Sequence, residues 1–298
     1  MINNIKPWIL AARLRTLPLS VSGIIVGSAY AYFQNHFDGL IFTLALVTTL
    51  AFQVLSNFAN DYGDGIKGTD AHRIGEKRMV ASGVISPQQM KKAVILMSVF
   101  SLVVAVGLIY VSFGRDNFLY SILFLLLGLA CISAAIKYTV GTKAYGYSGF
   151  GDVFVFVFFG LVAVMGSNFL YSKTVDVKLL LPAIAIGMLA TAVLNLNNMR
   201  DVENDTTAGK NTLVVKMGLK WAKNYQHFLI VVPFVLLFIF SIGINTRLFF
   251  SFWVFIFLLK HLEKVRKSNR YEDFDPELKK VALSTFVLSF LFFVSFLF

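Results

Sequence analysis

The sequence is poor in charged residues and almost free of cysteine. Only 14% of its 298 residues are charged, and Cys131 is its single cysteine. One thiol excludes a disulfide within the chain, and its position in an apolar run favours a buried apolar role. The low charge stands beside 57% hydrophobic residues and 31 phenylalanines, which lies outside the usual range for soluble domains. The chain is therefore expected to be an integral membrane protein.

Long apolar runs recur along the whole chain. Each has about the 17–25 residues that a helix needs to cross the hydrocarbon core. Nine such runs are centred near residues 17–34, 39–59, 93–113, 118–137, 150–171, 179–198, 226–244, 246–261 and 281–298. The first run lacks the cleavage site of a signal peptide and is expected to stay in the protein. The pattern predicts an all-α, multi-pass bundle of nine transmembrane helices around a central cavity, forming one domain over residues 1–298.

The basic residues gather in every second loop. The N-terminus and loops 60–92, 137–149, 199–225 and 260–280 hold 23 of the 27 lysines and arginines. The positive-inside rule therefore places the N-terminus in the cytoplasm, and nine crossings place the C-terminus on the extracytoplasmic side. Orientation explains the net charge of +11 without a nucleic-acid partner. The loop at 260–280 is interpreted as a solvated connection that faces anionic lipid.

Two acidic clusters follow the second and sixth apolar runs, at 57–70 and 197–211. On a helix, the cluster members project from one face. They are Asn57, Asn60, Asp61 and Asp64 in the first cluster and Asn197, Asp201 and Asp205 in the second. Each cluster has an Asn four residues before an Asp, and the two pairs are 140 positions apart. This spacing suggests two similar halves around one central site.

The clusters indicate a magnesium and diphosphate site. One cluster alone could be a helix end that emerges into water, but ionised groups near membrane depth are costly and two matched clusters favour bound cations. Mg²⁺ prefers such oxygen ligands and shares its remaining positions with water and phosphate. The nearest basic residues, Lys67, Arg78 and Lys210, either contact phosphate or are ordinary cytoplasmic charges. The glycines of the first cluster, including Gly63 and Gly65, are interpreted as the hinge of a closing loop.

A metal and diphosphate site beside apolar helices suggests a substrate with a charged head and an apolar tail, such as a polyprenyl diphosphate. Mg²⁺ would stabilise the departing diphosphate, and an electron-rich acceptor would attack the allylic cation. Arg15 either neutralises an acid on the substrate or marks the membrane boundary. A transporter is the alternative from another class, but it would place acids deep within the spans rather than at their ends.

The motifs resemble those of the UbiA superfamily of intramembrane prenyltransferases, and within it the branch that prenylates 1,4-dihydroxy-2-naphthoate. The resemblance is carried by PWILAARLRTLPLSVSG (7–23), NDYGDGIKGTD (60–70), ASGVIS (81–86), YGYSGFGDVFVFVFFG (145–160) and NNMRDVENDTTAGKNTL (197–213). It implies Mg²⁺-dependent transfer of a polyprenyl group with loss of diphosphate and CO₂, giving demethylmenaquinone, in the cell inner membrane. Sister branches act on 4-hydroxybenzoate, homogentisate or haem, and these acceptors remain alternatives.

The resemblance also implies roles for individual residues. Asn60, Asp61, Asp64, Asn197, Asp201 and Asp205 match the family motifs that bind Mg²⁺ and diphosphate. Gly68 stands where many members have a further Asp, which leaves the role of Asp70 open. The family has a Tyr and a Lys that assist prenyl binding, and the candidates here are Tyr138, Lys143 and Tyr145. Asp152 is either part of the site or a helix N-cap. Spacing identifies no general base, and His72 is interpreted as a residue of a solvated loop.

Overall fold

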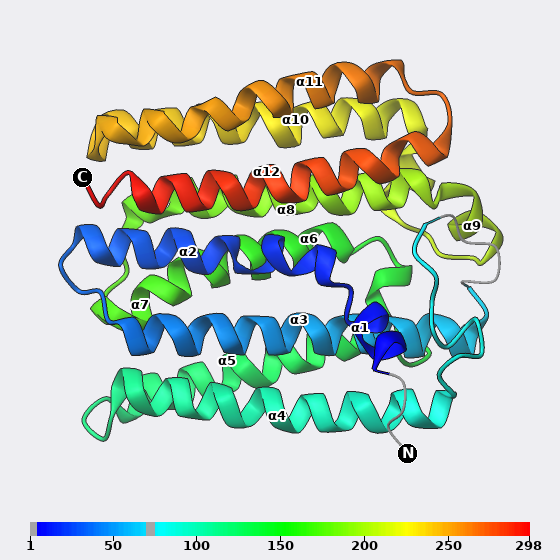
Figure 1. Ribbon diagram of the computed structural model, residues 1–298, viewed down its shortest axis with the longest axis horizontal. Helices are drawn as coiled ribbons and strands as arrows, with labels where there is room; N and C mark the ends of the chain where they lie inside the picture. The colour runs from blue at the N-terminus through cyan, green and yellow to red at the C-terminus, as the bar shows by residue number, and fades with distance from the viewer. Residues whose placement is uncertain (1–4, 70–74) are drawn as a thin grey trace.

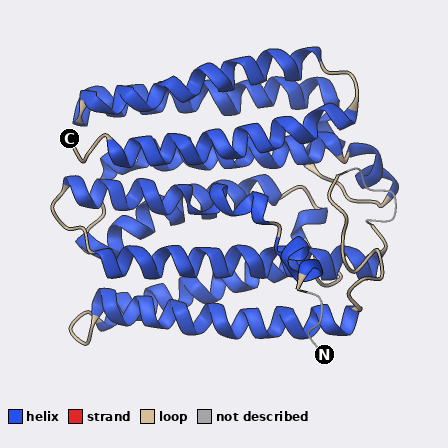
Figure 2. Ribbon diagram, in the orientation of Figure 1, coloured by secondary structure: helices blue, strands red, loops and turns tan. Residues whose placement is uncertain are grey.

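The computed structural model describes residues 5–69 and 75–298, and all regular structure in these ranges is helical (Figure 2). The elements are α1 (Lys6–Ala12), η1 (Leu14–Thr16), α2 (Leu17–Phe33), α3 (Gly39–Lys67), α4 (Pro87–Phe113), α5 (Phe118–Lys137), η2 (Tyr145–Tyr147), α6 (Gly151–Val155), η3 (Phe156–Gly166), α7 (Ser167–Ser172), η4 (Val177–Leu179), α8 (Leu180–Arg200), α9 (Val202–Thr207), α10 (Leu213–Ile244), η5 (Thr246–Trp253), α11 (Val254–Lys267), η6 (Tyr271–Asp273) and α12 (Phe274–Val294). The η3 segment is π-helical. The predicted all-α class is confirmed.

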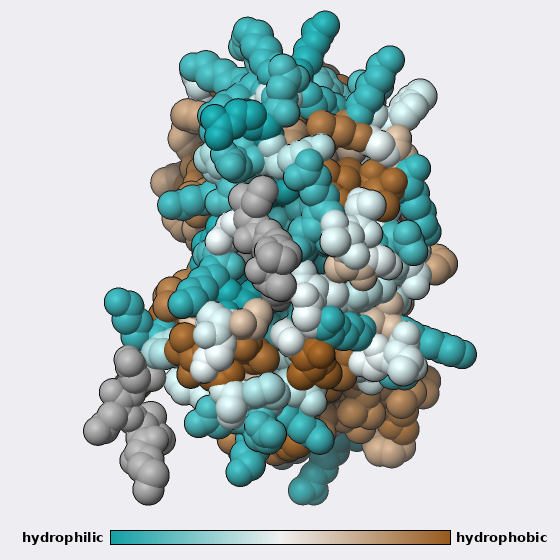
Figure 3. All heavy atoms as spheres, turned by 90° about the vertical axis from the view of Figure 1, so that its right-hand side faces the viewer, coloured by the Kyte–Doolittle hydropathy of each residue, from teal (hydrophilic) through white to brown (hydrophobic). Residues whose placement is uncertain are grey.

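The long helices run lengthwise through the molecule (Figure 1). The end on the right of Figure 1 carries the N-terminus, α9 and the long connections 75–86, 138–150 and 208–212, and we call it the polar end. Figure 3 looks onto this end, where hydrophilic side chains gather. The opposite end has short connections and the C-terminus. The acidic clusters therefore lie at the end of the bundle that has the long polar loops.

Within residues 5–69 and 75–298, seven helical segments are long and apolar enough to cross a membrane. They span Lys6–Phe33, Gly39–Lys67, Pro87–Phe113, Phe118–Lys137, Gly151–Ser172, Val177–Arg200 and Leu213–Ile244. The last two predicted spans correspond to η5 with α11 and to α12, which lie beside the others in Figure 1. Charged residues such as Lys260 in α11 and Glu277 in α12 shorten their apolar runs. A membrane bundle of seven candidate spans is thus observed, and the count of nine stays a prediction.

Helix α3 contains the first acidic cluster near its C-terminal end. Asp38 caps its N-terminus by accepting hydrogen bonds from the backbone N–H groups of Leu40 and Ile41. Gly68 ends it with a left-handed φ of 72°. Gly63 and Gly65 lie inside the helix, so the prediction that they form a loop hinge is wrong. A Cβ on Gly63 would lie 2.5 Å from Oγ1 of Thr139, which shows that this glycine permits close packing.

Close backbone contacts fix η3 beside α2 and α8. A Cβ on Gly27 would lie 2.2 Å from the carbonyl oxygen of Val164, and one on Gly160 would lie 2.5 Å from that of Ala183. Small residues allow such approach between membrane helices, where packing replaces the hydrophobic effect. The η3 segment is therefore held between α2 and α8, and its remaining side chains contribute to the cavity described next.

Candidate active site

A cavity of about 390 Å³ extends from the polar end into the bundle. Its polar part is lined by Asn60, Asp64, Arg78, Asn197 and Lys210. Its apolar part is lined by side chains of α5, η3 and α7, among them Phe124, Leu127, Phe158, Val162 and Leu170. A cavity of this composition accommodates a molecule with a charged head and an apolar tail. We call its polar part the mouth.

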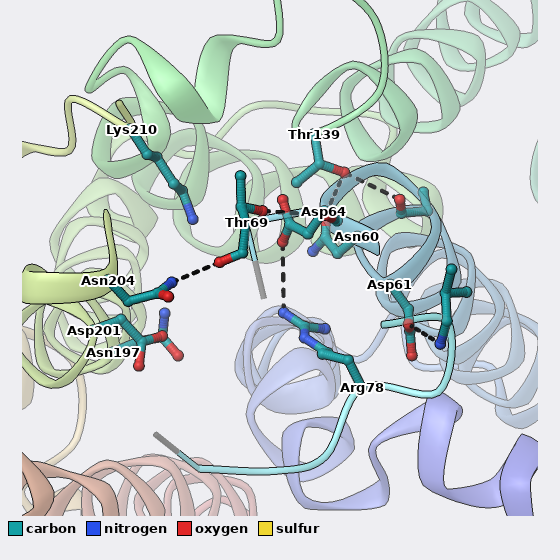
Figure 4. Close-up of polar contacts among 12 residues, drawn as sticks. Asn60, Asp61, Asp64, Thr69, Arg78, Thr139, Asn197, Asp201, Asn204 and Lys210 are labelled. Carbon is teal, nitrogen blue, oxygen red and sulfur yellow. Dashed lines mark hydrogen bonds and ion pairs between the residues drawn. The ribbon is translucent and has the colours of Figure 1, made fainter. Parts of the chain in front are cut away.

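Asp64 is the acid of the first cluster that faces the mouth. Its side chain is buried, and its Oδ1 accepts a hydrogen bond of 2.8 Å from the hydroxyl of Tyr147. Its Oδ2 lies 3.7 Å from Nη2 of Arg78, which is also buried (Figure 4). A buried carboxylate needs such partners because an uncompensated charge is costly in a low dielectric. Asn60 lies one turn before Asp64, and its Oδ1 accepts a hydrogen bond from Thr139.

Asp61 faces away from the mouth. Its Oδ1 accepts a hydrogen bond of 2.9 Å from the backbone N–H of Val80, and its Oδ2 accepts one of 3.0 Å from that of Met79. Asp61 is 1% exposed and does not line the cavity. The sequence placed Asp61 among the metal ligands, whereas this geometry gives it a structural contact. It anchors the segment that carries Arg78.

Asp201 in the second cluster is held by Arg200. The Arg200 Nε donates to Oδ1 of Asp201 at 2.7 Å, and Nη2 donates to Oδ2 at 2.8 Å. The same guanidinium donates to Oδ1 of Asn197 at 2.8 Å and pairs with Asp275 of α12. Arg200 is only 1% exposed, so it is a buried centre that fixes the end of α8.

Asp205 and Lys210 form the other pair of the second cluster, with 3.6 Å between Nζ and Oδ1. The two clusters are joined at the mouth by Asn204, whose Nδ2 donates to the carbonyl oxygen of Thr69 at 2.7 Å. Figure 4 shows Asp64 and Arg78 on one side of the mouth, with Asn197, Asp201 and Lys210 on the other. The fold therefore brings together two motifs that lie about 140 residues apart in the chain.

The other predicted residues fall into two groups. Arg15, Tyr138 and Tyr145 line the cavity. Arg15 is paired there with Glu76 at 2.8 Å and with Asp275 at 3.4 Å. Asp201 and Asp205 of the second cluster do not line the cavity themselves, whereas Asn197 and Lys210 do. The remaining predicted residues, Lys67, Lys143 and Asp152, do not line it either.

Outside the cavity lining, these three residues differ in their surroundings. Lys143 is exposed, and Asp152 is buried in the first turn of α6. Lys67 donates to the carbonyl oxygen of Thr139 at 2.7 Å. Asp70 and His72 lie outside the described residues.

Sequence reasoning missed two residues of this site. Tyr147 lies in the stretch 145–160, which carries part of the family resemblance, but spacing alone does not distinguish it from Tyr138 and Tyr145. Asp275 contacts both Arg15 and Arg200, although it lies in the loop 260–280, which the sequence predicts to be a solvated connection. The approach of α12 to α2 and α8 brings Asp275 there, and no local sequence signal reports that packing.

The donors at the mouth suit Mg²⁺. Asn60, Asp64 and Asn197 offer amide and carboxylate oxygens on the cavity wall. Within residues 5–69 and 75–298, no three acidic, His or Cys side chains gather into a metal cluster of their own. A metal ion here would complete its coordination with water and phosphate oxygens, which is the habit of Mg²⁺.

Comparison with known sequences identifies one family and relatives that share one name. The model of the UbiA prenyltransferase family matches residues 20–296. A 1,4-dihydroxy-2-naphthoate octaprenyltransferase from Escherichia coli (strain K12) is 46% identical, covering 87% of this chain and 82% of the relative. The Haemophilus influenzae protein of the same name is 41% identical over 98% of this chain and 96% of the relative.

Comparison with solved structures supports the fold. A UbiA homolog from Archaeoglobus fulgidus bound to GPP and Mg²⁺ superposes with a TM-score of 0.69 at 15% identity, over 98% of each chain. A digeranylgeranylglyceryl phosphate synthase superposes with a TM-score of 0.58 at 17% identity, also over 98% of each chain. At such low identity, the two likenesses establish the arrangement of the helices.

Proposed function

This chain belongs to the UbiA prenyltransferase family, and from that premise we propose that it transfers a polyprenyl group from polyprenyl diphosphate to 1,4-dihydroxy-2-naphthoate. The observation that carries the proposal is the cavity, which joins both acidic clusters to an apolar interior. The names of the Escherichia coli and Haemophilus influenzae relatives support the choice of acceptor. The products are diphosphate, CO₂ and the quinol form of demethylmenaquinone.

The diphosphate binds at the mouth. Arg78 and Lys210 lie on opposite sides of it and supply positive charge, which complements phosphate oxygens. Asp64 with Asn60 on one side, and Asn197 with Asp201 and Asp205 on the other, would hold Mg²⁺, which would supply the Lewis acid that stabilises the departing diphosphate. Arg200 keeps the Asp201 carboxylate in place through two hydrogen bonds.

The prenyl chain occupies the apolar part of the cavity. Phe124, Phe158 and Leu170 line this part and offer apolar contacts to the chain. Tyr138 and Tyr145 line the cavity beside the mouth, and their rings stabilise a developing allylic cation through the negative face of the π-system.

The acceptor enters near Arg15, whose positive charge offsets the carboxylate of the naphthoate. The ring carbon that carries this carboxylate attacks the allylic carbon, the bond to the diphosphate oxygen breaks, and the carboxyl group then leaves as CO₂. The electron pair of the carboxyl bond returns to the ring, which restores its aromaticity. Each turnover therefore releases one diphosphate and one CO₂.

The membrane arrangement completes the proposal. We place the protein in the cell inner membrane as nine crossings, with the polar end toward the cytoplasm, the C-terminus on the other side and the acidic clusters in two similar halves of one domain. The concentration of basic residues in the loops of the polar end supports this orientation.

An acceptor comparison tests the proposed function. Purified protein in liposomes is given one prenyl diphosphate, Mg²⁺ and either 1,4-dihydroxy-2-naphthoate or 4-hydroxybenzoate, and the products are identified by mass spectrometry. The naphthoate is expected to be prenylated and 4-hydroxybenzoate to remain unchanged. Prenylation of 4-hydroxybenzoate without reaction of the naphthoate overturns the choice of acceptor. If neither mixture releases diphosphate, the proposed prenyltransferase activity is wrong.

A further inference from the structure

We propose that Tyr147 is a positioning residue that orients the Asp64 carboxylate for Mg²⁺ and holds Lys210 at the mouth for the diphosphate. The proposal deepens the proposed function and rests on it. Tyr147 is the last residue of η2, in the connection between α5 and α6. This connection belongs to neither acidic cluster, yet Tyr147 contacts residues of both.

The hydroxyl of Tyr147 is aimed at the first cluster. It donates to Oδ1 of Asp64 at 2.8 Å and lies 3.1 Å from Oγ1 of Thr69. A carboxylate that lines a cavity can rotate about its side chain unless a second group fixes it, and partners of this kind set the orientation of metal ligands. Arg78 lies near the other carboxylate oxygen, Oδ2, so each oxygen of Asp64 has one partner.

The ring of Tyr147 lies close to the ammonium groups of two lysines. Nζ of Lys67 lies 4.0 Å from the ring centroid, and Nζ of Lys210 lies 5.6 Å from it. Both distances fall within the range of cation–π attraction, which is about 6 Å. Lys67 ends α3, whereas Lys210 follows α9, so one aromatic ring contacts a cation from each of the two clusters.

The backbone of Tyr147 fixes this arrangement. Its carbonyl oxygen accepts a hydrogen bond of 3.0 Å from the N–H of Asn211, next to Lys210. Lys216 donates to the carbonyl oxygen of Ser148 at 2.8 Å, which ties the same connection to the start of α10. Tyr147 therefore joins the two halves of the mouth through its hydroxyl, its ring and its main chain.

The test separates the hydroxyl from the ring. Tyr147→Phe removes the hydrogen bond to Asp64 and keeps the ring, whereas Tyr147→Leu removes both. Tyr171→Phe is the matched control, because it also removes one tyrosine hydroxyl with a 2.9 Å hydrogen bond, to Ser28, and it does not line the cavity. The first readout is the Mg²⁺ concentration that gives half of the maximal rate. The second is the rise in melting temperature that Mg²⁺ produces with geranyl thiodiphosphate, a donor analogue that reacts slowly, which reports binding without turnover.

Tyr147→Phe is expected to raise the half-saturating Mg²⁺ concentration about tenfold, as is typical for loss of an outer partner of a metal ligand. Most of the maximal rate returns at saturating Mg²⁺. Tyr147→Leu is expected in addition to raise KM for the prenyl diphosphate. A Mg²⁺ response of Tyr147→Phe equal to those of Tyr171→Phe and the unmodified protein, in both readouts, overturns the positioning role. If instead the unmodified protein shows no Mg²⁺-dependent rate or melting shift, the proposed function fails as well.

Discussion

The Oδ1 of Asp61 accepts a hydrogen bond of 2.9 Å from the backbone N–H of Val80, two residues after Arg78. Its Oδ2 accepts a second one from the N–H of Met79. Asp61 and Asp64 are three residues apart in one motif, yet one carboxylate holds a protein segment and the other faces the cavity. Neighbouring acids of the same motif therefore have different tasks, and this difference can be measured.

Asp61→Asn should lower stability rather than affinity for Mg²⁺. The amide retains only one acceptor oxygen and places an NH₂ group against a backbone N–H, which costs about 1–3 kcal/mol when a buried hydrogen-bond partner is lost. The expected result is a lower melting temperature in detergent and an unchanged half-saturating Mg²⁺ concentration. A higher Mg²⁺ requirement at an unchanged melting temperature would instead make Asp61 a metal ligand.

Asp64→Asn and Asp201→Asn should each abolish most activity. Either change removes a negative charge that is proposed to bind Mg²⁺. Loss of one electrostatic contact to a transition state commonly lowers the rate about 100-fold or more. Initial rates of diphosphate release measure the effect. Asp116→Asn is the control, because Asp116 is exposed at the end opposite the mouth. Rates of Asp64→Asn close to those of this control would remove Asp64 from the site.

Removal of divalent metal should stop the reaction reversibly. The carboxylates at the mouth are balanced by arginine and lysine, so the fold is expected to survive chelation while diphosphate release ceases. Activity in EDTA, followed by titration with Mg²⁺ and with Ca²⁺, checks this. Full activity in the presence of the chelator would contradict a metal role.

Gly166→Leu should shorten the prenyl chain that the protein accepts. Gly166 lines the cavity at the end of η3, and a Cβ placed there meets no atom within 4 Å, so the larger side chain projects into open space. We expect transfer of a geranyl group to persist and transfer of an octaprenyl group to fall. Mass spectrometry of products from mixed donors measures the ratio. Gly107→Leu, which also has space around it but does not line the cavity, should leave the ratio unchanged. An unchanged ratio in Gly166→Leu would place the chain elsewhere.

Gly63→Ala should destabilise the protein. The added Cβ would lie 2.5 Å from Oγ1 and 2.8 Å from the backbone carbon of Thr139, and overpacking of this kind typically costs about 1–3 kcal/mol. Gly107→Ala in α4 has no neighbour within 4 Å and should be neutral or slightly stabilising, because alanine favours helix. Equal melting temperatures of the two variants would show that Thr139 moves away from the added Cβ with no loss of stability.

The sequence predicted the helical class and the convergence of the acidic clusters, because apolar run length and alternating loop charge are local signals. Asn60, Asp64 and Asn197 could be placed at one site from helical spacing and from the side on which their helices end. Tyr147 and Asp275 could not, since their contacts depend on how a loop folds and how α12 packs. The contacts of Asp61 and Gly63 could not be predicted either, because helical spacing gives the face on which a residue lies but not the neighbour that packs against that face.

The proposed prenyl transfer with loss of CO₂ is tested most directly by following the carboxyl carbon of the acceptor. Purified protein is supplied with polyprenyl diphosphate, Mg²⁺ and 1,4-dihydroxy-2-naphthoate labelled with ¹³C in its carboxyl group, and ¹³CO₂, diphosphate and prenylated product are measured together. The expected result is one labelled CO₂ and one diphosphate for each prenylated naphthoquinol, with all three products dependent on Mg²⁺. Prenylated product that retains the label, or diphosphate released without any prenylated naphthoate, would contradict it.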